Sequence, residues 1–114
     1  MRRGEIWVGN LNPNRGAEVG KIRPVLIIQA DFLIGQGEPT IIVLPLTTQV
    51  RQAKEPLHVT IQARERLVQT CQVVPEQPRT LDRKRLVDGP LTALRPEELL
   101  AVERALAAVL GLFI

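Results

Sequence analysis

Several chemistries are disfavoured by residues that the sequence lacks. It contains no serine, a single histidine, His58, and a single cysteine, Cys71. Without serine there is no serine nucleophile, and one histidine, one cysteine and no carboxylate cluster at ligand spacing do not favour a transition-metal site. We therefore expect no metal and no cofactor. A lone cysteine forms no intrachain disulfide, which fits a reducing cytosol, and a small buried side chain is its simpler interpretation.

Signatures of nucleotide binding and of membrane insertion are also missing. The chain has no GxxxxGK[ST], GxGxxG or GxSxG motif, so neither a phosphate-binding glycine loop nor a nucleophile elbow is expected. Its aromatic residues are Trp7, Phe32 and Phe113, too few for a surface that stacks many bases. The N-terminus lacks the apolar core of a signal peptide, and the last apolar run, residues 105–114, is too short to cross a bilayer. We expect a cytoplasmic protein without membrane contacts.

The composition is that of a small globular protein with a basic balance. The 114 residues, 45% hydrophobic and 24% charged, predict a single domain spanning residues 1–114 with one modest core. The net charge is +3, and twelve arginines stand against three lysines. This bias favours bidentate contacts with anions, although a GC-rich coding sequence would produce the same bias.

Alternating and β-branched runs predict five to six short strands. The predicted strands span residues 4–11, 24–29, 40–46, 57–61 and 68–74, with a last extended piece at 87–91. Between the first two lies a glycine- and proline-containing loop, residues 12–20, whose length is typical of functional and mobile loops. Trp7 falls on the opposite register from Ile6 and Val8, so we expect it against a partner surface or the C-terminal helix rather than in the core.

One convincing helix is predicted, over residues 96–110. Pro96 suits the first helical position, and Glu97 and Glu98 suit the positive end of the helix dipole. Apolar residues recur at helical spacing at Leu99, Val102, Leu106, Val109 and Leu110. This stripe predicts core packing, with a dimer contact as the alternative. Short strands followed by one helix predict a small, mainly β barrel closed or flanked by that helix.

The densest positive charge lies in residues 76–86. It comprises Arg79, Arg83, Lys84 and Arg85. Thr80 is in position to cap a single helical turn over residues 81–85. A run of charges is usually a solvated face. We therefore expect an Arg83→Ala substitution to change the activity of the protein little.

Residues 16–29 pass from a glycine-containing loop into a dense apolar strand and bring Arg23 to the start of that strand. A guanidinium suits a phosphate, although a strand-edge arginine is more often solvated or ion-paired. RNA can be cleaved by its own 2′-hydroxyl if a protein aligns the reacting atoms and stabilises the developing charge. Arg23 and Thr47, at the start of one strand and the end of the next, would meet at one rim if these strands were antiparallel neighbours. An arginine and a hydroxyl would then suffice for this reaction.

The chain resembles the MazF/PemK family of toxin endoribonucleases, the mRNA interferases of type II toxin–antitoxin pairs. The matching motifs occur in family order along nearly the whole chain: RGEIW at 3–7, LxP at 11–13, GxExGKxRPV at 16–25, PLT at 45–47, QxRTLD at 77–82 and RL at 85–86. Each motif alone is weak, but the ordered set is specific.

This resemblance implies an SH3-like barrel with a C-terminal α-helix that works as a homodimer and cuts single-stranded RNA at short specific sequences without a metal. It implies that Arg23, in KxRP, and Thr47, in PLT, are the catalytic residues. It also implies that the loop of residues 13–20 and the segment 77–79 border the RNA groove, with RNA contacts from Glu18, Lys21, Thr48, Gln77 and Arg79. The partner would be a small antitoxin whose acidic, disordered tail occupies that groove.

Alternatives of other classes remain open from the sequence. The same fold hosts toxins that bind and poison DNA gyrase without catalysis, and a barrel that binds RNA or a peptide without turnover is a third reading. The Arg23-Pro24 and Pro45-Leu46-Thr47 motifs argue against the gyrase poison. The general base and acid are not assigned, and Glu18 is the candidate for the base.

Overall fold

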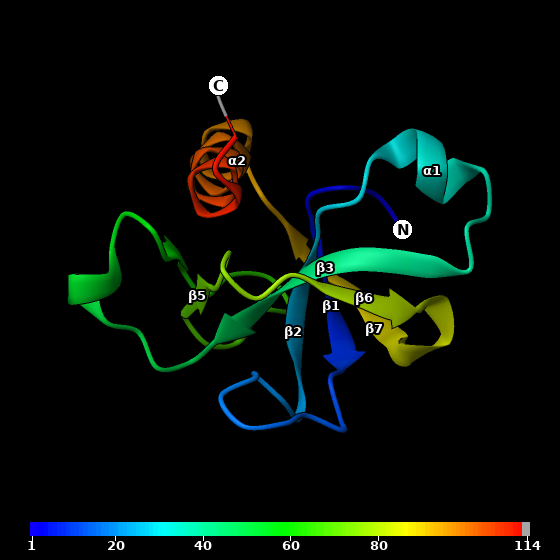
Figure 1. Ribbon diagram of the computed structural model, residues 1–114, viewed down its shortest axis with the longest axis horizontal. Helices are drawn as coiled ribbons and strands as arrows, with labels where there is room; N and C mark the ends of the chain where they lie inside the picture. The colour runs from blue at the N-terminus through cyan, green and yellow to red at the C-terminus, as the bar shows by residue number, and fades with distance from the viewer. Residues whose placement is uncertain (113–114) are drawn as a thin grey trace.

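The computed structural model describes residues 1–112, which form seven strands and two α-helices (Figure 1). The strands are β1 (Glu5–Asn10), β2 (Ile22–Ile27), β3 (Thr40–Thr47), β4 (Val59–Ile61), β5 (Cys71–Val73), β6 (Arg79–Asp82) and β7 (Leu86–Ala93). The α-helices are α1 (Asp31–Gly35) and α2 (Pro96–Leu110), and short 3-10 turns form at η1 (Gln52–Lys54) and η2 (Arg83–Arg85). The prediction of a mainly β barrel-like fold with a C-terminal helix is confirmed. Within residues 1–112, no helix has the length and apolar content needed to cross a membrane.

The strands form one antiparallel, curled sheet in the order β4-β5-β3-β2-β1-β7, with β6 off this path. The central strand is β3, which pairs with β2 along one edge. Its other edge is shared, because the first half pairs with β6 and the last two residues pair with β5. Figure 1 shows the result: β5 and β6 leave β3 on opposite sides of the sheet's centre. A strand that serves two diverging neighbours must twist strongly, and this curls the sheet.

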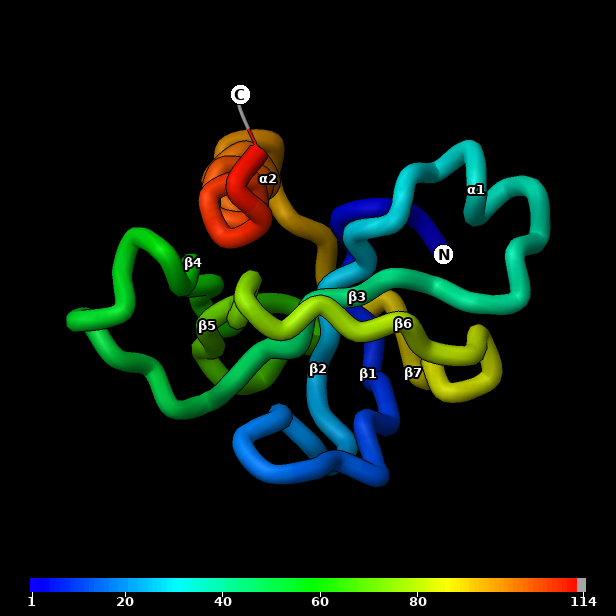
Figure 2. The backbone as a smooth tube through the Cα atoms, viewed as in Figure 1, coloured from blue at the N-terminus to red at the C-terminus, as the bar shows by residue number. Residues whose placement is uncertain are grey.

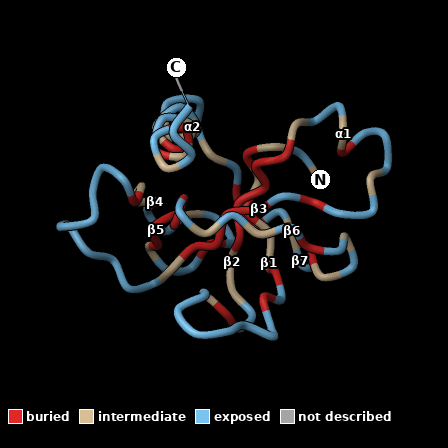
Figure 3. Tube along the Cα trace, viewed as in Figure 1, coloured by how far each residue is buried: buried red, intermediate tan, exposed pale blue. Residues whose placement is uncertain are grey.

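Both faces of the central strands are buried, which explains their continuous apolar runs. In β2 and just beyond it, Val25 and Ile27 enter one core cluster, whereas Leu26 and Ile28 enter a second. The second cluster is covered by α2 through Val102, which is fully buried. In Figure 3 the buried residues accordingly gather where the strands cross and on the inner side of α2.

Trp7 packs against the first of these clusters, so the expectation that it avoids the core is wrong. A β-bulge between β1 and β7 at this residue breaks the simple alternation on which that expectation was based. The indole lies directly over Gly89, where an added Cβ would come within 2.1 Å of the ring. Its Nε1 donates to Glu5 Oε1 at 3.0 Å.

The helical turn expected over residues 81–85 is confirmed only in its last part, because residues 81–82 end the strand β6 and residues 83–85 form the 3-10 turn η2. Thr80 pairs with Ile42 of β3 and caps nothing. The 3-10 turn starts later, and its cap is Asp82, whose Oδ1 accepts a hydrogen bond from Lys84 N at 2.8 Å. Four residues are too short a run for alternation to reveal a strand, and only the pairing with β3 decides it.

The basic run after β6 is not the solvated face that the sequence predicts. Arg83 donates from Nε to the Glu38 carbonyl at 3.1 Å and from Nη2 to the Ile34 carbonyl at 3.0 Å. Arg85 donates to the Asn12 carbonyl. These guanidinium groups tie η2 to α1 and to the loop after β1, so Arg83 is a structural residue and the expectation of a neutral Arg83→Ala substitution loses its basis.

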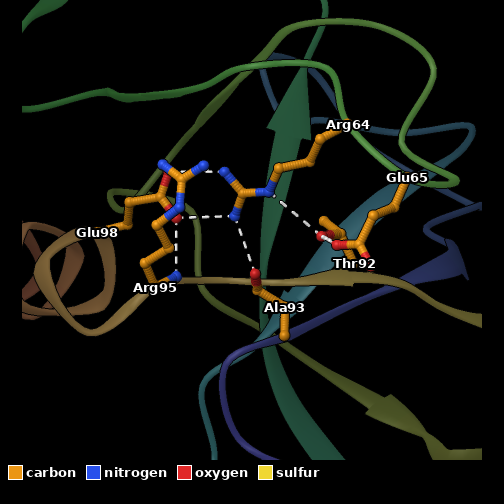
Figure 4. A network of polar contacts seen from close by, with 6 residues as sticks. All are labelled: Arg64, Glu65, Thr92, Ala93, Arg95 and Glu98. Carbon is orange, nitrogen blue, oxygen red and sulfur yellow. Dashed lines mark hydrogen bonds and ion pairs between the residues drawn. The ribbon is translucent and has the colours of Figure 1, made fainter.

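The connection between β4 and β5 lies against the far edge of β7 and closes the curled sheet. Arg66 N donates to the Leu91 carbonyl at 3.0 Å, and Arg64 Nη2 donates to the Ala93 carbonyl at 2.9 Å. Arg64 also forms a bidentate pair with Glu98 in the first turn of α2, at 2.9 and 2.7 Å (Figure 4). The same network thereby fixes the end of β7 and the start of the helix.

Two residues with functional potential are structural. His58 is buried just before β4, so it lies outside the observed strand although the prediction placed it within one, and its Nε2 lies 2.8 Å from a Glu76 carboxylate oxygen. Cys71 is buried in β5, as predicted, and burial raises the pKa of its thiol while the charge of Arg23 acts in the opposite direction.

The start of α2 and its outer face complete the fold. Arg95 precedes the helix without a side-chain cap, and Glu98 compensates by accepting from the Arg95 N–H at 2.8 Å. Of the predicted stripe, Val102 is buried and Leu99 and Leu106 pack against the core, but Leu110 is exposed. The last two residues of the apolar run at 105–114 lie outside the described residues.

Candidate active site

Arg23 and Thr47 meet at one end of the β2–β3 pair. The two strands are antiparallel with Val25 opposite Pro45, and two further residues along each strand place Arg23 opposite Thr47. Arg23 Nη1 donates from β2 to the Leu46 carbonyl of β3 at 3.3 Å. The prediction that the two residues lie at the same rim is therefore confirmed by the pairing of the strands.

The guanidinium of Arg23 is held from one side and free on the other. Its Nε donates to the Gly20 carbonyl at 2.7 Å, which, with the bond to Leu46, fixes the plane of the group. Within residues 1–112, its Nη2 makes no hydrogen bond and the group forms no ion pair. A half-buried, uncompensated guanidinium with a free edge is a binding group for an anion such as a phosphate oxygen.

The hydroxyl of Thr47 is oriented by the turn that follows β3. Its Oγ1 accepts a hydrogen bond from Gln49 N at 3.1 Å. An occupied lone pair leaves the hydroxyl proton available for donation to a ligand. The rim thus presents a fixed cation and an oriented hydroxyl donor side by side.

A cavity of about 420 Å³ opens over this pair. Of the RNA contacts implied by the resemblance, Glu18, Lys21 and Thr48 line it together with Arg23 and Thr47. Its remaining walls are Asn14, Ala17, Val19, Gly20 and Gln49. Lys21 is exposed with a positive φ of 72°, a conformation uncommon for residues other than glycine and often found at functional sites.

Gln77 and Arg79 do not line this cavity but a neighbouring one of about 380 Å³, and Ala17 and Glu18 line both cavities. Gln77 Oε1 accepts from Val19 N at 2.6 Å and its Nε2 donates to the Ala17 carbonyl at 3.3 Å. Arg79 donates to the carbonyls of Val19 and Leu11, each at 3.3 Å. Figure 2 shows the resulting course of the loop between β1 and β2. This loop is anchored at several points, whereas the sequence suggested a mobile connection.

The base of the loop depends on Asn12, a residue that nothing in the sequence marks as important. Asn12 Oδ1 accepts from Lys21 N at 2.9 Å, and Leu11 N donates to the Lys21 carbonyl at 2.9 Å. These bonds bring the two ends of the loop together and set Lys21 at the cavity edge. Only the fold reveals such contacts, because asparagine is common in any loop.

No metal cluster is found in the described part of the chain: no group of three or more histidine, cysteine, aspartate or glutamate side chains is placed to hold an ion. What the cavity offers is positive charge from Arg23 and Lys21, a threonine hydroxyl donor, and one carboxylate, Glu18, whose Oε1 accepts from Arg15 N at 2.7 Å. These groups can bind a phosphodiester and stabilise negative charge on it.

Comparison with known proteins places the chain in a family. A family model described as "PemK-like, MazF-like toxin of type II toxin-antitoxin system" matches residues 2–110. The chain belongs to this family. Its KxRP and PLT motifs contribute the arginine and the threonine that meet at the rim of the cavity.

Solved structures of MazF proteins share the fold at low sequence identity. The MazF crystal structure from Deinococcus radiodurans has a TM-score of 0.82 at 23% identity and covers 98% of this chain and 97% of its own. The Mycobacterium tuberculosis toxin MazF-mt6 has a TM-score of 0.79 at 23% identity, covering 96% and 99%. A mycobacterial endoribonuclease in complex with its cognate antitoxin has a TM-score of 0.77 at 23% identity, covering 100% and 98%.

Proposed function

We propose that residues 1–114 form a single toxin domain that cleaves single-stranded RNA at short specific sequences without a metal. Cleavage of messenger RNA would inhibit translation and growth until a cognate antitoxin neutralises the protein. One observation carries the proposal: Arg23, with a free guanidinium edge, and Thr47, with an available hydroxyl proton, lie opposite each other in one cavity. Family membership supports the same reaction.

The reaction that fits these groups is attack of the substrate 2′-oxygen on the adjacent phosphorus. The 2′-hydroxyl loses its proton, the bond from phosphorus to the 5′-oxygen breaks, and that oxygen takes up a proton. The products are a 2′,3′-cyclic phosphate and a 5′-hydroxyl. Arg23 and Thr47 donate hydrogen bonds to the non-bridging oxygens, on which negative charge grows in the transition state. Glu18, in the same cavity, is our candidate for the base.

The RNA strand would enter over the loop between β1 and β2. Glu18, Lys21 and Thr48 line the cavity, so we assign them direct contacts with the nucleotides next to the cleaved bond. Gln77 and Arg79 bind the backbone of this loop, which supports a role for both residues in shaping the RNA groove. They would have this role in addition to any direct contact with RNA.

The protein would act in the cytoplasm as a homodimer and bind a small antitoxin with an acidic, disordered tail. A net charge of +3 and the uncompensated Arg23 favour such a tail over the same cavity. Relatives of the same fold have been solved with their antitoxins bound, which supports this kind of partner.

Cleavage of a long single-stranded transcript in EDTA tests the proposal. We expect fragments with 2′,3′-cyclic phosphate and 5′-hydroxyl ends, and a loss of activity of at least about 100-fold in Arg23→Ala and in Thr47→Val. Absent cleavage by the wild-type chain, or undiminished cleavage by Arg23→Ala, would contradict it. A gyrase supercoiling assay with the same preparation separates a gyrase poison from a ribonuclease.

A further inference from the structure

A fully buried glutamine lies beside the proposed catalytic pair. Gln72 is in β5, is 0% exposed, and pairs with Thr47 in the register of β3 and β5. Burying a primary amide costs free energy unless its polar atoms are hydrogen-bonded. The partners of this amide therefore indicate what the buried side chain accomplishes.

Both ends of the Gln72 amide bind the backbone of one residue. Oε1 accepts from the Arg51 N–H at 3.1 Å, and Nε2 donates to the Arg51 carbonyl at 3.0 Å. Paired residues of antiparallel strands exchange two hydrogen bonds in the same way, so the side chain acts as one rung of a β-ladder. Nε2 also donates to Thr60 Oγ1 at 3.1 Å, so both amide hydrogens are used.

Arg51 terminates the turn that orients the Thr47 hydroxyl. Within that turn, Gln49 N donates to Thr47 Oγ1 at 3.1 Å. The turn continues directly from β3, which fixes its first end. The buried amide fixes its second end, although the residues between, 48–51, are all exposed. An exposed turn is thus held in one conformation by a side chain from the core.

We propose that Gln72 is a positioning residue for RNA cleavage, an inference that rests on the proposed function. By holding Arg51, it keeps the Gln49 N–H on the Thr47 oxygen, so the hydroxyl proton points at the phosphate site. Without the amide, the exposed turn would bond to water instead. The fold would persist, but the Thr47 hydroxyl would lose its orientation. Misplacement of a group that acts on the reacting atoms lowers the rate of the chemical step more than it lowers the affinity for the substrate.

The chain supplies a matched control at the other end of β3. Gln29 is also buried and also binds backbone through both ends of its amide: Oε1 accepts from Ile42 N at 3.1 Å and Nε2 donates to the Thr40 carbonyl at 3.3 Å. Gln29 is not part of the cavity. Gln29→Met and Gln72→Met thus each remove two buried hydrogen bonds to the backbone, and Gln72→Met also removes the bond to Thr60, but only the second variant acts on the turn.

The test combines amide hydrogen exchange by NMR with steady-state cleavage of a short single-stranded RNA. In Gln72→Met we expect the Gln49 and Arg51 amides to exchange at least about tenfold faster, because the two hydrogen bonds that hold Arg51 are lost. We expect kcat to fall roughly 10- to 100-fold with a much smaller change in KM. Gln29→Met should lower the melting temperature similarly and leave both readouts at wild-type values.

Three results would overturn the inference: unchanged exchange at Gln49 in Gln72→Met, unchanged kcat in that variant, or equal kcat losses in the two methionine variants. Should Gln72→Met fail to fold, Gln49→Pro removes the orienting N–H without touching the core and must reproduce the kcat loss. Failure of the wild-type chain to cleave RNA would instead refute the proposed function itself, so the two failures are distinguishable.

Discussion

Arg23, near the start of β2, and Arg64, in the connection between β4 and β5, are both half-buried arginines, yet their guanidinium groups are used in opposite ways. Arg64 donates hydrogen bonds only within the protein, to both carboxylate oxygens of Glu98, to the Ala93 carbonyl and to the Thr92 hydroxyl. Arg23 has two carbonyl partners and, within the described residues, no carboxylate. The difference teaches that unused hydrogen-bonding capacity, more than burial or charge, separates an arginine proposed to bind a ligand from a structural one.

Replacing each arginine by lysine tests this comparison with the largest expected effect. Arg23→Lys keeps the charge but loses the planar fork, so we expect kcat/KM for RNA cleavage to fall about 100-fold with an unchanged melting temperature. Arg64→Lys should leave kcat/KM within about twofold at 25 °C and lower the melting temperature. Retained activity in Arg23→Lys would mean that simple charge neutralisation suffices at this position.

Removing Arg64 should break the structural side of the comparison. Arg64→Met leaves Glu98, whose side chain is 15% exposed, without its bidentate partner. Breaking such a pair costs more than the pair contributes, because the remaining charge is poorly solvated. We expect the free energy of unfolding to drop by about 2 kcal/mol, measured by urea denaturation. A double variant that also carries Glu98→Gln should recover part of this loss. No recovery would show that the loss of stability comes mainly from the missing hydrogen bonds between Arg64 and β7.

The pH dependence of stability gives the smallest but most specific effect. Hydrogen bonding from Arg64 lowers the pKa of Glu98 below the usual range of a glutamate carboxyl. A carboxyl with a lowered pKa stabilises the fold at pH values above its unfolded pKa, and this contribution is lost as the pH falls through the folded pKa. The stability difference between wild type and Glu98→Gln should therefore be constant from pH 7 to about pH 5 and shrink below about pH 4.5. A difference that persists undiminished at pH 3 would contradict the role of this ion pair.

The sequence predicted that Arg23 and Thr47 meet at one rim, because their meeting depends on local features. Arg23 precedes an apolar strand and Thr47 ends the next one, and antiparallel pairing of consecutive strands brings these positions together. The C-terminal helix was predicted for the same reason, since its periodicity and its first-turn residues are contiguous in the chain.

The remaining features depend on contacts between distant segments. The short helix α1 has five residues, too few for helical periodicity to be visible. The buried Gln72 looks in the sequence like any polar residue of a half-exposed strand, and Arg64 looks like any charged turn residue. Their roles arise from partners 21 and 34 residues away, and a single sequence does not report such pairings.

The closure of the sheet by the β4–β5 connection has a consequence for the solubility of the protein. An open strand edge is a template onto which a second chain can add by intermolecular β-pairing, the first step of aggregation. On the outer side of β7, the carbonyls of Pro90, Leu91 and Ala93 are already occupied by donors from Arg64 and Arg66. Two arginines thereby act as gatekeepers, and they protect an edge that would otherwise be exposed whenever the protein accumulates.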